Sequence, residues 1–78
     1  MPKNINLLIE QIEINQKQIS FSDLLKICLL NKDLPHSKGE IYFLITTLKA
    51  LGIFNELKNQ EYEINWSAYN KLKKEGSI

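Results

Sequence analysis

A helix whose two ends are both encoded by specific residues constrains this 78-residue chain more than any other feature. Ser37 and Glu40 fit a capping box, in which the serine hydroxyl accepts a hydrogen bond from the backbone three residues on and the glutamate reaches back. At the other end, Gly52 suits the left-handed residue that terminates a helix, and Ile53 can then pack against the last turn. The pattern predicts a helix over about residues 38–51 that cannot continue into the segment that follows.

Two short strands and a last helix are expected after Gly52. Residues 61–66 alternate apolar with polar side chains, the period-two pattern of a half-buried strand, and residues 53–57 are expected to pair with them across a turn. Ser67 can then cap a short helix over residues 68–75. The lysines near the end of that helix suit the negative end of its dipole.

Two further helices are expected in the first part of the chain. Residues 3–14 place isoleucine and leucine side chains on one stripe of an amphipathic helix. Ser20 and Asp23 form a second capping-box pattern, with aspartate in place of glutamate, and predict a helix over about residues 21–31. Pro35 lies in the loop to the next helix, because proline disfavours helix in the residue before it.

The order of these elements is helix, short extended segment, helix, helix, hairpin and terminal helix. That order predicts a mainly α fold with a small β-hairpin, namely a winged helix-turn-helix with an added short C-terminal helix. We expect one such domain over residues 1–78, since an apolar fraction of 44% is ordinary for a globular chain. A three-helix bundle with an irregular tail is the alternative.

Charge and hydropathy exclude several classes of protein. The net charge is only +1, and all ten basic residues are lysines, so the chain has no bidentate arginine for phosphate or guanine. The apolar runs of the chain, such as residues 27–30, are far too short to span a bilayer. The N-terminus lacks the pattern of a secretory signal, and we therefore expect a cytoplasmic protein without membrane contact.

No catalytic or metal-binding pattern is apparent in the sequence. His36 is the only histidine, and it has no second histidine or cysteine pair to complete a metal site. Cys28 is the single cysteine and sits among apolar residues, which indicates an inert core thiol. We expect neither an enzyme nor a cofactor.

The outward face of the helix over residues 38–51 is nearly uncharged. A helix that reads bases is expected to carry arginine, lysine, asparagine or glutamine there, and phosphate contacts dominate nucleic-acid affinity. A small winged-helix DNA-binding regulator is therefore the alternative function, and DNA contact is expected to be secondary. The lysines that would serve it are Lys38, Lys49, Lys58, Lys71, Lys73 and Lys74.

An aromatic residue on the same face favours a protein partner instead. Phe43 has small neighbours there, and outward aromatics of this kind anchor protein interfaces. The alternative is that Phe43 packs under the N-terminal or the C-terminal helix. The helix over residues 21–31 is apolar around most of its circumference, and one helix in a small domain rarely buries every side. We expect a larger protein as partner, or a homodimer, bound through Leu25, Leu29, Phe43, Thr46, Thr47 and Ala50.

The segments 19–25 and 41–54 together resemble the small middle components of bacterial ABC-three-component systems, which include Lamassu-type anti-phage defence. The likeness covers about residues 5–64, and its most specific part is the Leu-x-x-Leu-Gly-Ile-Phe run at residues 48–54. The resemblance implies an adaptor without catalytic residues that attaches to an SMC-like ABC ATPase or to an effector subunit. A phage-encoded inhibitor that sequesters a host protein is a third hypothesis.

Overall fold

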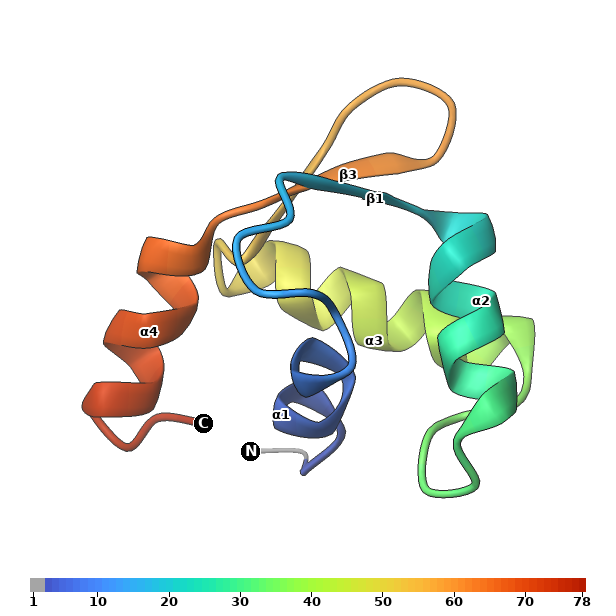
Figure 1. The fold of residues 1–78 in the computed structure, drawn as a ribbon, viewed down its shortest axis with the longest axis horizontal. Helices are drawn as coiled ribbons and strands as arrows, with labels where there is room; N and C mark the ends of the chain where they lie inside the picture. The colour runs from blue at the N-terminus through green and yellow to red at the C-terminus, as the bar shows by residue number, and fades with distance from the viewer. Residues whose placement is uncertain (1–2) are drawn as a thin grey trace.

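Four helices and a three-stranded antiparallel sheet form residues 3–78, the part of the chain that this computed structural model describes (Figure 1). Residues 1 and 2, which the single-domain prediction included, lie outside that part. The fold is a small α+β domain. Its elements, in chain order, are α1 (Lys3–Glu10), β1 (Gln18–Ser20), α2 (Phe21–Leu30), α3 (Lys38–Ala50), β2 (Phe54–Glu56), β3 (Glu61–Ile64) and α4 (Trp66–Lys74).

The first helix is shorter than the predicted 3–14. After Glu10 the chain tightens, because the N–H groups of Gln11 and Ile12 donate to carbonyls three residues back at 3.1 and 3.0 Å. Asn15 then takes a left-handed conformation with φ +69°. Ile12 is nevertheless buried, so the apolar periodicity located a core residue that lies outside the helix.

The sheet has one strand more than the predicted hairpin. β3 lies in the centre and pairs antiparallel with β2 on one side and β1 on the other, where Ile19 faces Tyr62. The short extended segment expected before α2 is therefore the third strand, and three residues are too few to show a strand period. The alternative of a helical bundle with an irregular tail is wrong, because the tail forms paired strands.

The predicted ends of α3 are confirmed. The Ser37 hydroxyl accepts a hydrogen bond from the Glu40 N–H at 3.2 Å. The Glu40 carboxylate in turn accepts from that hydroxyl at 2.9 Å, and not from the backbone. At the other end Gly52 has φ +79°, and the Ile53 N–H donates to the Leu48 carbonyl at 3.0 Å. Ile53 and Leu48 are both fully buried, so the helix end is part of the core.

The last helix begins two residues earlier than expected. Asn65 caps it, with the side-chain oxygen accepting from the Ala68 N–H at 3.0 Å, and the predicted cap at Ser67 is wrong. The Asn65 N–H donates to the Ile53 carbonyl at 2.7 Å, which fixes the residue at the end of β3 in an extended conformation suited to a cap. In Figure 1 this junction leads from β3 into α4, which lies beside α1.

The core lies between α1, α2, α3 and the sheet, and no polar or charged residue of the described part is buried in it. Burial raises the pKa of the Cys28 thiol above its ordinary value, which keeps the thiol neutral. No helix within residues 3–78 has the length and apolar character needed to cross a membrane. The buried core residues are Ile5, Leu8, Ile9, Ile12, Ile19, Phe21, Leu24, Cys28, Leu34, Ile41, Leu44, Ile45, Leu48, Ile53, Phe54, Tyr62, Ile64 and Tyr69.

Candidate protein-interaction surface

The outward side of α3 carries the predicted interface residues Phe43, Thr46, Thr47 and Ala50, which we call the α3 face. The Phe43 side chain is 71% exposed, Thr46 and Ala50 are exposed, and Thr47 is half-buried. The two threonine hydroxyls donate to backbone carbonyls one turn earlier, at 2.9 Å and 3.1 Å. These hydroxyls are therefore satisfied within the helix, and the face offers less polar chemistry than its composition suggests.

A recess of about 170 Å³ borders Phe43. Phe43, Leu44 and Thr47 contribute one side of it, and Pro35 from the loop before α3 contributes another, with Asn4 and Glu40 completing the lining. The α3 face thus combines a protruding aromatic ring with an adjoining hollow. Side chains of a protein partner pack into surfaces of this shape.

The predicted residues on α2 divide into two kinds. Leu29 is 54% exposed, whereas Leu25 is half-buried against the core and offers little free surface. Neither of them lines the recess beside Phe43, so the structure does not bring all six predicted residues to one site. Leu30, outside the predicted set, is the most exposed large apolar side chain of residues 3–78 at 88%. Its place in the last turn of α2, just before the cap residue Asn31, was the sequence feature that could have indicated this exposure.

A tyrosine next to the α3 face holds α3 against the rest of the fold. The Tyr42 ring stacks on Phe21 of α2 at 4.4 Å between centroids, and its hydroxyl accepts from the Gln60 side chain at 2.7 Å. Gln60 also accepts from the Phe21 N–H at 2.8 Å through its carbonyl. The start of α2, the middle of α3 and the β2–β3 turn are therefore tied together, and no pattern in the sequence indicated this junction.

The six lysines proposed for DNA contact are distributed over α3, the β2–β3 turn and α4. Lys49 is already engaged, since its ammonium lies 2.6 Å from the Glu56 carboxylate. That hydrogen bond is the main reason why the pKa of Lys49 is raised above its ordinary value of 10.5. The Lys73 ammonium lies 5.7 Å from the centre of the Tyr69 ring. The lysine beside the α3 face thus has an internal acidic partner.

Within residues 3–78 no group of histidine, cysteine, aspartate and glutamate is arranged to hold a metal ion. His36 lies in the loop before α3, where its Nε2 is 3.0 Å from the Asn31 carbonyl. Comparisons with protein-family models, with curated proteins and with solved structures gave no significant match to the chain. The geometry of the α3 face therefore carries the functional interpretation.

Proposed function

We propose that the chain is a non-catalytic adaptor that binds a protein partner through the α3 face. The observation that carries the proposal is the 71% exposure of Phe43 beside a recess, among four α3-face residues that are all uncharged; Glu40 is the one charged residue that lines the recess. Burying a phenylalanine side chain contributes roughly 1.5–3 kcal/mol, so exposure of the ring leaves a large favourable term for a partner to recover. Aromatic anchors of this kind contribute much of the binding energy of protein interfaces.

We propose further that the fold is a winged helix. The order α1, β1, α2, α3, β2, β3 supports this assignment, and so does the antiparallel sheet with β3 between β1 and β2. The β2–β3 turn would then be the wing, α3 the helix that reads DNA in many winged helices, and α4 an addition to the common fold.

Three features of α3 favour protein over DNA as its partner. The exposed Phe43 cannot hydrogen-bond to base edges, and the threonine hydroxyls are directed to the helix backbone. Lys49 would have to leave Glu56 before it could contact a phosphate. A DNA-binding regulator would depend on Lys38, Lys58 and the lysines of α4 instead.

The resemblance described above indicates which partner to test first. An SMC-like ABC ATPase, or the effector subunit that accompanies it, is the expected binding partner in a bacterial cytoplasmic complex of the anti-phage type. The α3 helix includes part of the run that carries the resemblance, which supports its use as the attachment point.

Co-purification tests the proposal directly. A tagged chain expressed with its neighbouring genes should retain a larger partner, and Phe43→Glu should abolish that retention while the circular dichroism spectrum stays unchanged. Leu57→Glu is the matched control, because it adds the same charge at another exposed apolar residue, outside the α3 face. Retention of the partner by Phe43→Glu at the wild-type level would refute the α3 face as the binding site.

A gel-shift series against salt concentration tests the regulator. Tight binding to a defined duplex with a steep loss of affinity as salt rises would support DNA recognition, because each neutralised phosphate releases counterions. Weak binding with no preference among duplexes would favour the adaptor.

A further inference from the structure

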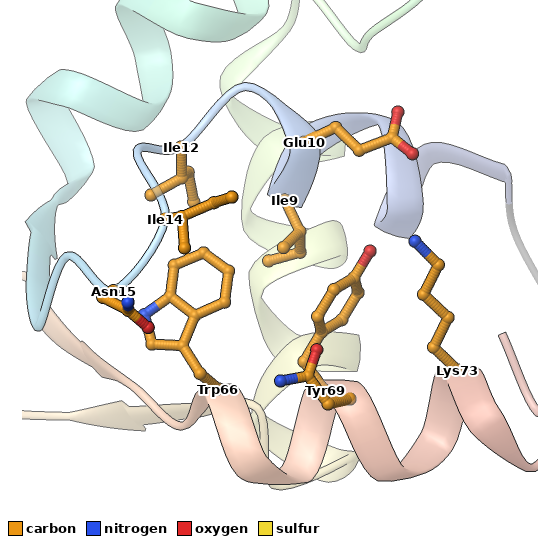
Figure 2. Close-up of a pocket in the computed structure, with 9 residues that line it drawn as sticks. Ile9, Glu10, Ile12, Ile14, Asn15, Trp66, Tyr69 and Lys73 are labelled. Atoms are coloured by element: carbon orange, nitrogen blue, oxygen red, sulfur yellow. The ribbon is translucent and has the colours of Figure 1, made fainter.

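A second recess, of about 300 Å³, lies between the end of α1 and α4 (Figure 2). It shares no lining residue with the recess beside Phe43. Figure 2 shows the Trp66 and Tyr69 side chains extending from α4 toward α1 and the turn that follows it. The apolar lining comes from Ile9, Ile12, Ile14, Trp66 and Tyr69, and the polar lining from Glu10, Asn15, Asn70 and Lys73.

The two aromatic rings are fixed, and their polar atoms are already engaged. The Trp66 indole N–H donates to the Gln16 carbonyl at 2.7 Å, and the Tyr69 hydroxyl donates to the Asn6 side-chain oxygen at 3.0 Å. The rings meet edge to face at 6.2 Å. Tyr69 is only 5% exposed, so the free aromatic surface of the recess is that of the half-buried Trp66, which an occupant can cover without displacing a hydrogen bond of the fold.

The apolar lining of the recess extends to the protein surface at Ile14, whose side chain is 78% exposed. The turn that holds it is set by Asn15 in the left-handed conformation, with φ +69°. Ile14 is therefore presented outward beside the recess and extends its apolar lining to the surface.

The polar lining specifies the chemistry of the occupant. Neither the Glu10 carboxylate nor the Lys73 ammonium forms an ion pair with a side chain of residues 4–78. One negative and one positive group thus line the same recess without neutralising each other. The side-chain amides of Asn15 and Asn70 can each donate and accept, as a peptide group does.

We propose that this recess docks a second polypeptide, which inserts one large apolar side chain flanked by a basic and an acidic residue. Trp66 and Ile14, the apolar lining residues with free surface, receive the apolar group, Glu10 faces the basic neighbour and Lys73 faces the acidic one. The two asparagine amides bond to the peptide groups between them. This inference rests on the proposed adaptor function for its biological meaning and gives the adaptor a second binding surface, built by α4.

Trp66 provides the readout, since it is the only tryptophan of the chain and lines the recess. The probes are the capped peptides acetyl-Lys-Phe-Glu-amide and acetyl-Glu-Phe-Lys-amide, which cover both directions of the chain. At millimolar concentration at least one should change the tryptophan fluorescence saturably. The same peptides with alanine in place of phenylalanine should not.

Two substitutions locate the binding. Ile14→Asp should weaken it at least tenfold, whereas Leu30→Asp, the matched control at an equally exposed apolar residue outside the recess, should leave it unchanged. Lys73→Glu should shift preference toward a peptide with lysine on both sides of phenylalanine by roughly two- to five-fold, the contribution of one exposed ion pair. Phe43→Glu should leave peptide binding intact, so that failure of the α3 face and failure of this recess give different results.

Several results would overturn the proposal. They are no saturable binding of either peptide, equal binding of the alanine peptides, or full binding by Ile14→Asp. Free phenylalanine binding as tightly as the peptides would identify a small-molecule site in place of a polypeptide site.

Discussion

Replacing two glycines by alanine should change the stability of this fold in opposite directions. Gly52 terminates α3 with φ +79°, and a methyl group there would meet no atom within 4 Å. The cost of Gly52→Ala is therefore conformational alone, about 1–2 kcal/mol for a non-glycine residue held in the left-handed region. Gly39 lies in the first turn of α3, where an added methyl group would also meet open space, and Gly39→Ala should stabilise by about 0.5 kcal/mol because alanine loses less backbone entropy.

Urea unfolding followed by circular dichroism measures both changes. The two midpoints should move to opposite sides of the wild-type value with the same slope, and the melting temperatures of the variants should differ by roughly 10 °C. Wild-type stability for Gly52→Ala would mean that the chain does not hold residue 52 in the left-handed conformation. Destabilisation by Gly39→Ala would show that alanine disturbs the first turn of α3.

Three further results are expected. Asn65→Ala should lower the free energy of unfolding by about 1 kcal/mol and Ser67→Ala should leave it nearly unchanged in thermal denaturation, because only Asn65 caps α4; equal losses would contradict the cap. The Lys49–Glu56 pair raises the pKa of Lys49, so its stabilisation is complete below pH 10.5 and fades as the pH rises through the folded-state value; denaturation across alkaline pH should show this extra loss in the wild type and not in Glu56→Gln. A thiol reagent should label Cys28 no faster than the fold opens, because the side chain is buried and its pKa is raised; rapid labelling of the native protein would contradict that burial.

The features that local chemistry determines could be predicted from the sequence. Ser20 and Ser37 begin α2 and α3, and Gly52 ends α3, since each satisfies backbone groups within four residues of itself. The helical period placed Phe43 on the outward side of α3, where the structure shows it exposed. These signals need no knowledge of distant parts of the chain.

The features that distant contacts decide could not be predicted in this way. β1 exists because it pairs with β3, far along the chain, and α4 starts at Trp66 because the sheet fixes Asn65 through Ile53. The recess beside α4 depends on that start, since Trp66, which lines it, would not be part of a helix that began two positions later. The partial burial of Leu25 against the core could not be predicted for the same reason.

The internally bonded hydroxyls of Thr46 and Thr47 have a thermodynamic consequence. Covering the α3 face would strip water from methyl groups and an aromatic ring without depriving either hydroxyl of a partner. Calorimetry of the complex should then record a negative heat-capacity change with an affinity that hardly responds to ionic strength. A ligand held by phosphate contacts would instead lose affinity steeply as salt is added.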